Sequence, residues 1–173
     1  TPVELGKEPY VYSSSQTITE KGAKAIKLVP KNSVLVCCIG SLGKTAIAGC
    51  EVGTNQQINS VIFDEGKVFP KYGYYALNRL KSLMVSLAPS TTVAIINKSN
   101  FEALEIPLPP LEEQKRIAAI LDKADAIRRK RQQAIDLADD FLRAIFLDMF
   151  GDPVTNPKGW EVKSLRDISR IQI

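Results

Sequence analysis

The segment Gly40-Ser41-Leu42-Gly43-Lys44-Thr45 comes nearest, by residue type and spacing, to a site for chemistry. It resembles the end of a phosphate-binding P-loop, in which backbone N–H groups and a lysine hold phosphates. The full pattern needs a glycine where this chain has Cys38. The residues after Lys44 look like a strand, whereas a P-loop opens a helix. We therefore do not expect nucleotide hydrolysis. A plain hairpin turn, or a turn that presents Lys44 to a nucleic-acid phosphate, fits the pattern.

The sequence contains no histidine, which excludes His-based catalytic triads and His-ligated zinc sites. Its three cysteines, Cys37, Cys38 and Cys50, lie in apolar surroundings and do not suggest a disulfide framework. The longest apolar run, residues 34–39, is too short to cross a bilayer. We expect no catalytic residue, no metal site, no cofactor bound by this chain and no membrane association, and a cytoplasmic location.

The segment Asn55-Gln56-Gln57-Ile58-Asn59 gathers four side-chain amides just before an expected strand. Asparagine and glutamine can hydrogen-bond the edges of DNA bases, adenine above all, but they are also ordinary loop residues. The net charge is +4, and most of the excess lies before residue 111. That charge is compatible with nucleic-acid binding without establishing it.

The elements that must position these residues read as an α+β domain with a mixed or antiparallel sheet and short helices. Alternating or continuous apolar runs predict strands over residues 34–39, 45–48 and 58–63. Apolar residues at helical spacing predict a helix over residues 70–87, and Ser99 with Glu102 fits a capping box for one short helix.

A long helix follows this domain. Pro109 and Pro110 suit a first helical turn, and no further glycine or proline appears before Gly151, which suits a helix end. At 1.5 Å per residue such a helix would be roughly 60 Å long, which suggests a spacer.

Apolar side chains recur along this helix in three neighbouring rows, interrupted by Arg128 and Arg131. Three rows form a stripe that packs on one or two other helices, as in a coiled coil. A helix folded against its own domain is the alternative, and the stripe would then face that domain. The residues expected in the packing interface are Ile117, Ile120, Leu121, Ala124, Ile127, Ala134, Ile135, Ala138, Phe141, Leu142 and Ile145.

Taken in order, several segments resemble the specificity subunit of Type I restriction–modification systems. The most specific is Ile106-Pro-Leu-Pro-Pro-Leu-Glu-Glu-Gln-Lys-Arg-Ile117 with the long helix after it. The other segments that carry the resemblance are residues 18–23, 40–44, 55–57, 96–100 and 159–165.

The resemblance implies a non-catalytic DNA-recognition subunit of a bacterial defence system. In that family two recognition domains each read half of a bipartite site, and two antiparallel helices set the gap. The helices dock methyltransferase subunits, which bind S-adenosylmethionine, and a restriction subunit completes the nuclease. Applied here, residues 1–107 are a target-recognition domain lacking its start, 108–150 the spacer and dimerisation helix, and 151–173 a linker and the start of a second recognition domain.

The residues expected to contact double-stranded DNA are Ser41, Lys44, Thr45, Asn55, Gln56, Gln57, Asn59, Thr91 and Thr92. The chain has one helix where the family has two, so we expect either a fragment or a half-subunit that forms a homodimer through the helix. Two other readings stay open: a coiled-coil adaptor that does not bind DNA, and the recognition part of a fused adenine methyltransferase.

Overall fold

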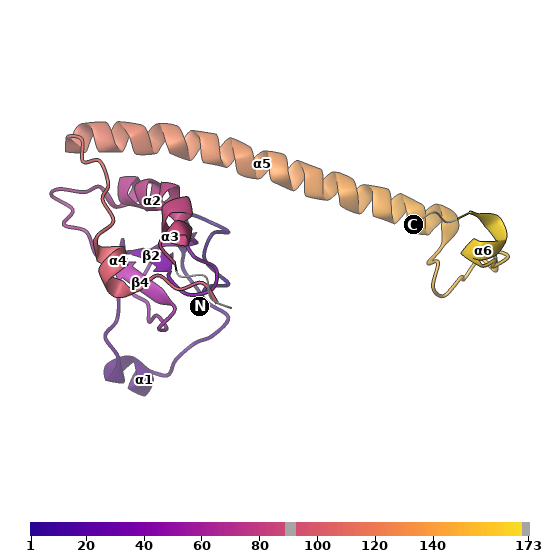
Figure 1. Ribbon diagram of the computed structural model, residues 1–173, viewed down its shortest axis with the longest axis horizontal. Helices are drawn as coiled ribbons and strands as arrows, with labels where there is room; N and C mark the ends of the chain where they lie inside the picture. Colours follow the sequence, from indigo (N-terminus) through magenta and orange to yellow (C-terminus); the bar gives the residue numbers. More distant parts are fainter. Residues whose placement is uncertain (89–92, 171–173) are drawn as a thin grey trace. The chain divides into compact units, whose positions relative to one another are not determined.

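The computed structural model describes residues 1–88 and 93–170 and divides into two units, residues 1–123 and 124–173 (Figure 1). Nine of the ten helices and strands among these described residues begin in the first unit. The elements are β1 (Tyr10–Val11), α1 (Glu20–Ala25), β2 (Val34–Cys37), β3 (Thr45–Ala48), β4 (Ile58–Val61), α2 (Pro70–Arg79), α3 (Lys81–Ser86), α4 (Lys98–Glu102), α5 (Leu111–Phe150) and α6 (Leu165–Ile168).

The first unit is built on a four-stranded mixed sheet with strand order β1-β3-β2-β4. Strand β2 is antiparallel to both β3 and β4, and the short β1 runs parallel to β3. The pairs Val36↔Thr45 and Cys37↔Ile58 set the register at one end of the sheet. The expected α+β class, with a mixed sheet, short helices and one long helix, is confirmed.

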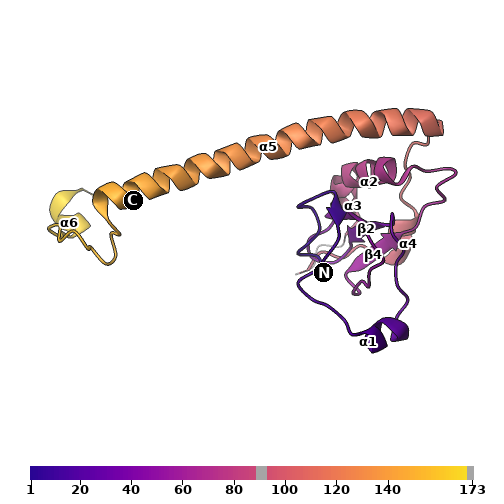
Figure 2. The ribbon, with the colours of Figure 1, turned by 180° about the vertical axis from the view of Figure 1, so that it is seen from behind.

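The two faces of the sheet carry separate hydrophobic clusters, because successive side chains of a strand point to opposite faces. The first face bears Val34, Val36 and Ile47, which pack with Tyr74 and Leu77 of α2 and Met84 of α3. The second face bears Leu35, Cys37 and Ala46, which pack with Leu5 and Val29. Figures 1 and 2 show α2 and α3 on one side of the sheet and α1 on the other.

Before α5, four expected elements have boundaries that differ from the structure. The helix expected over residues 70–87 is two helices, α2 and α3, separated at Leu80, whose ψ of 2° leaves the helical region. Helix α4 begins one residue before the expected cap Ser99; Asn97 caps it by accepting a 2.8 Å hydrogen bond from the Asn100 N–H. Strands β2 and β4 each end two residues earlier than expected, at Cys37 and Val61.

Helix α5 ends at Phe150, as the sequence predicts, but starts three residues after the expected residue 108. It starts at Leu111, so both Pro109 and Pro110 precede it instead of forming its first turn. The Pro110 carbonyl accepts a 3.0 Å hydrogen bond from the Gln114 N–H. At the other end Gly151, with φ +78°, donates its N–H to the Leu147 carbonyl at 2.9 Å.

In the second unit, the residues that follow α5 cap its C-terminus. The Lys158 ammonium donates to the Met149 carbonyl at 2.8 Å, and the Trp160 indole donates to the Phe150 carbonyl at 3.0 Å. These donors satisfy backbone carbonyls that a helix end leaves without partners. A cation there also interacts favourably with the helix dipole. Within the described part of the chain, no helix is long and apolar enough to cross a membrane.

Candidate nucleic-acid interface

The two segments expected to contact DNA lie side by side at one end of the sheet. They are the β2–β3 turn (residues 38–44) and the amide segment (residues 55–59). The Cys37 N–H donates to the Lys44 carbonyl at 2.8 Å, and the next N–H, that of Cys38, donates to the Gln57 carbonyl at 2.7 Å. Because β2 is antiparallel to both neighbours, its end meets the beginnings of β3 and β4. Main-chain hydrogen bonds therefore join two segments that are separate in sequence.

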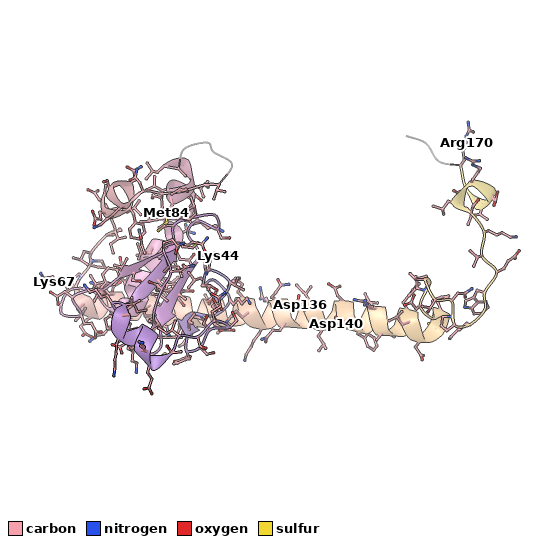
Figure 3. All side chains as sticks on the ribbon, turned by 90° about the horizontal axis from the view of Figure 1, so that it is seen from below. Lys44, Lys67, Met84, Asp136, Asp140 and Arg170 are labelled. Carbon is pink, nitrogen blue, oxygen red and sulfur yellow. The ribbon has the colours of Figure 1, made fainter. Side chains whose placement is uncertain are left out.

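The β2–β3 turn presents some side chains to solvent and buries others. Gly40 and Gly43 adopt φ values of +77° and +72°, and Leu42 is buried against the first-face cluster. Ser41 and Lys44 are exposed. Thr45 is 1% exposed, and its hydroxyl has no hydrogen-bond partner among the described residues. The accessible members of the expected set in this turn are thus Ser41 and Lys44; Figure 3 labels Lys44.

The amide segment is partly organised by its own hydrogen bonds. The Asn55 side-chain oxygen accepts from the Gln57 N–H at 3.2 Å, and the Asn55 amide donates to Gln57 Oε1 at 3.1 Å. Gln56 is exposed, while Asn59 is half-buried in β4, paired with Val36. No described residue accepts from the Gln57 amide nitrogen, so its two donors remain free for a ligand. Thr91 and Thr92 lie outside the described residues.

The chemistry at this end of the sheet is that of hydrogen bonds and charge. Burial raises the pKa of the Cys38 thiol to about 11, so this sulfur stays protonated at neutral pH. Among the described residues, no group of three or more His, Cys, Asp or Glu side chains could hold a metal ion. What remains accessible is a lysine, a serine and several amides, which suit the recognition of phosphates and base edges.

A glutamine that the sequence analysis did not single out anchors α5 within the first unit. The Gln114 side chain is fully buried; it accepts a 2.9 Å hydrogen bond from the Phe69 N–H. Its amide donates to the carbonyls of Lys67 and Pro109 at 2.9 and 2.8 Å. One turn later Ala118 is buried against Val68 and Tyr72. The position looked like one polar residue in a polar first turn, and only its tertiary contacts reveal its role.

Further along the same stretch, Asp122 joins α5 to α2. Its carboxylate pairs with the Lys71 ammonium and accepts a 3.0 Å hydrogen bond from the Tyr75 hydroxyl. The ammonium of Lys71 also lies 5.5 Å from the centre of the Tyr10 ring. Four side chains from β1, α2 and α5 thus form one polar cluster on the domain.

The expected helix-packing stripe is largely uncovered. Ile117 is half-buried against the domain, next to Ala118. The remaining predicted members are exposed in the chain: Ile120, Leu121, Ala124, Ile127, Ala134, Ile135, Ala138, Phe141, Leu142 and Ile145. Figure 3 shows side chains standing all around α5 near the labelled Asp136 and Asp140. The rows are therefore available to a partner, and their role in packing stays a prediction.

Residues 4–137 match the family model described as "Type I restriction modification DNA specificity domain". The chain is 28% identical over 193 aligned residues to the MjaIX specificity subunit of Methanocaldococcus jannaschii, covering 99% of this chain and 44% of that protein. It is 32% identical over 135 residues to the EcoR124I/EcoR124II specificity subunit of Escherichia coli, covering 73% of this chain and 33% of that protein.

Solved structures give the same picture of the fold. One, from work titled as the structural basis of complex assembly and conformational transition of the type I R-M system, superposes with a TM-score of 0.56 at 28% identity. That match covers 71% of this chain and 31% of the other. The Type I restriction–modification S subunit from M. genitalium, at 23% identity and a TM-score of 0.56, shares the fold over 96% of this chain. The chain spans less than half the length of each of these proteins.

Proposed function

Because the chain belongs to the family of Type I restriction modification DNA specificity domains, we propose that it recognises one half of a bipartite DNA site. The observation that supports this most directly is the meeting of the β2–β3 turn and the amide segment at one end of the sheet. A contiguous surface with a free lysine and free amides combines backbone positioning with base reading, the two components of sequence-specific binding.

Roles follow from the chemistry of each side chain. Lys44 is proposed to contact a backbone phosphate, with Ser41 beside it, because an ammonium is a point charge that carries no base information. Gln57 is proposed to read a base edge, since Asn55 holds it in place and its amide donors are free. Gln56 and Asn59 are the neighbouring amides that could extend this reading. Thr45 is buried and supports the turn rather than touching DNA.

Helix α5 is proposed to set the spacing between two half-sites. It is 40 residues long, so its length is roughly 60 Å at 1.5 Å per residue. Its first turns are fixed to the domain through Gln114 and Ala118. The exposed apolar rows beyond them would pack against a second such helix, either from another copy of the chain or from the rest of a longer protein.

The same helix and the adjoining surfaces are proposed to dock methyltransferase subunits and, through them, the restriction subunit. In this arrangement S-adenosylmethionine binds the methyltransferase subunits, and the chain itself contributes only the recognition of the DNA sequence. The proposed setting is the cytoplasm, where chromosomal DNA is modified.

The test is reconstitution of the chain with its methyltransferase subunits, followed by mapping of methylated adenines on a genomic library. We expect a bipartite consensus, and Gln57→Ala should relax the preference at one base pair, with a loss of about 1–3 kcal/mol in discrimination. Gln132→Ala, an exposed amide on α5, is the matched control and should leave the consensus unchanged. A complex that assembles but methylates without sequence preference would favour a coiled-coil adaptor instead.

A further inference from the structure

A second lysine, Lys81 of α3, packs against the β2–β3 turn. At Gly43 an added Cβ would lie only 2.7 Å from Cγ of Lys81 and 2.9 Å from its Cβ, so the Lys81 stem lies directly on the turn. Lys81 opens α3, whose Met84 is fully buried in the same cluster as Leu42 of the turn. The position of Lys81 is therefore fixed by core packing, although the residue itself is exposed.

The Lys44 side chain lies on the opposite face of the sheet from Lys81. Thr45 is paired with Val36 and shares the first face with it, so the preceding residue points to the second face. The contacts agree: Lys44 Cγ lies 3.5 Å from the position of an added Cβ on Gly6. Gly6 follows Leu5, a member of the second-face cluster. One lysine thus stands on each side of the same turn.

Both charges are uncompensated in the described part of the chain. Neither Lys44 nor Lys81 forms an ion pair there, whereas Lys71 and Lys115 are paired with Asp122 and Glu112. Two free ammonium groups on either side of one turn match an anionic ligand that carries a line of negative charge along each of two sides. A groove of double-stranded DNA has this form, with a phosphate backbone along each edge.

We infer that Lys81 is a further DNA-binding residue, and that Lys44 and Lys81 contact phosphates on opposite strands of the groove that the β2–β3 turn enters. The inference rests on the proposed function and deepens it. The lysine pair centres the turn in the groove, and the neighbouring amide segment is thereby placed over base edges. Gly43 makes this arrangement possible because its missing side chain leaves room for the Lys81 stem.

The first experiment measures how DNA affinity depends on salt in the complex with the methyltransferase subunits. The variants are Lys44→Ala, Lys81→Ala and the double variant, with Lys31→Ala as control. Lys31 is an exposed lysine before β2, at the opposite end of the sheet. Each single change should reduce the slope of log K against log salt by about one, and the double change by about two. The control should keep the wild-type slope.

The second experiment assigns the strands. Methylphosphonate linkages, which are neutral, replace phosphates one at a time on either strand of the half-site. Wild-type protein should lose affinity at positions on both strands. Lys44→Ala should become insensitive to substitutions on one strand only, and Lys81→Ala to those on the other. If Lys81→Ala behaves like Lys31→Ala, or both lysines map to one strand, the inference is wrong. If wild-type protein shows no sequence-dependent binding, the proposed function fails first.

Discussion

The backbone N–H of Phe69 donates a 2.9 Å hydrogen bond to Oε1 of Gln114, a side chain with no exposed surface. The bond joins the segment that leads into α2 to the first turn of α5, across 45 positions of sequence. The same amide also donates to Lys67 and Pro109. One side chain therefore satisfies three backbone groups and ties the start of the long helix to the domain.

Replacing this glutamine should be costly. Gln114→Leu keeps the volume but removes three hydrogen bonds and leaves buried backbone groups unpaired, so we expect a loss of about 3 kcal/mol in the free energy of unfolding. Urea denaturation followed by circular dichroism measures it. Gln132→Leu is the control, because Gln132 is exposed on the same helix and should change stability by less than about 0.5 kcal/mol. A loss below about 1 kcal/mol for Gln114→Leu would contradict the anchoring role.

Substitutions at two glycines of the β2–β3 turn can distinguish the cost of backbone strain from the cost of a steric clash. Both Gly40 and Gly43 have positive φ, but nothing lies within 4 Å of a Cβ added at Gly40, whereas at Gly43 it meets Lys81. We expect Gly40→Ala to cost about 1 kcal/mol from backbone strain alone, and Gly43→Ala about 2–3 kcal/mol because α3 must also shift. Denaturation gives the energies, and the NMR shift of the Met84 methyl group reports the displacement of α3. Equal effects of the two changes would mean that α3 does not rest on the turn.

The cysteines should differ in reactivity and in pH dependence. Burial raises the pKa of Cys38 to about 11 from an ordinary value of 9.0, so its thiol is neutral at pH 8. Cys50 is only partly buried. A disulfide reagent at pH 8 should modify Cys50 first and spare Cys37 and Cys38 until urea is added.

The raised pKa of Cys38 also predicts how the free energy of unfolding depends on pH. Because the folded-state pKa is raised, the stabilisation from the neutral thiol is complete below pH 9 and is lost as the pH rises through about 11. Cys38→Ala should remove this part of the alkaline loss, as measured by urea denaturation at pH 8 and pH 10.5. An unchanged difference between the two pH values would show that other groups cause the loss.

The exposed rows of α5 should support helix pairing. Leu142→Asp places a charge in the middle of the apolar stripe, where Leu142 is 65% exposed. Burial of a leucine contributes about 1.5–3 kcal/mol, so loss from both copies of a dimer should raise its dissociation constant by about a hundredfold or more. Analytical ultracentrifugation measures this. Gln133→Asp adds the same charge on the opposite side of the helix and should have little effect. Equal weakening by both variants would mean that the stripe is not the interface.

Local signals were enough to predict some elements and not others. The ends of α5 follow from Pro110 and Gly151, whose backbone preferences act within a few residues. The break at Leu80 could not be predicted, because apolar spacing continues across it into α3, where Met84 is buried in the core. Strand ends were placed too late for a similar reason: Ile39 has a strand-like side chain, but it pairs only through an isolated bridge to Ile95.

In the candidate interface, too, some features could be predicted from the sequence and others depend on tertiary packing. The sequence indicated which residue types could touch DNA, and the structure brought the β2–β3 turn and the amide segment together through β2. The sequence could not indicate that Thr45 would be buried or that Lys81 would lie against Gly43, because both depend on tertiary packing. Gln114 was missed because a buried amide and an exposed one look alike in sequence.

The two segments at the end of the sheet are joined to it by backbone groups, through the N–H of Cys37 and the N–H of Cys38. Such bonds do not depend on which side chains the segments carry, and among the residues of the turn Leu42 contributes to the core. Ser41, Lys44 and Gln56 can therefore be exchanged with little effect on folding. If the proposed function holds, exchange of these two short loops would change the DNA sequence that is read and leave the sheet and the long helix intact.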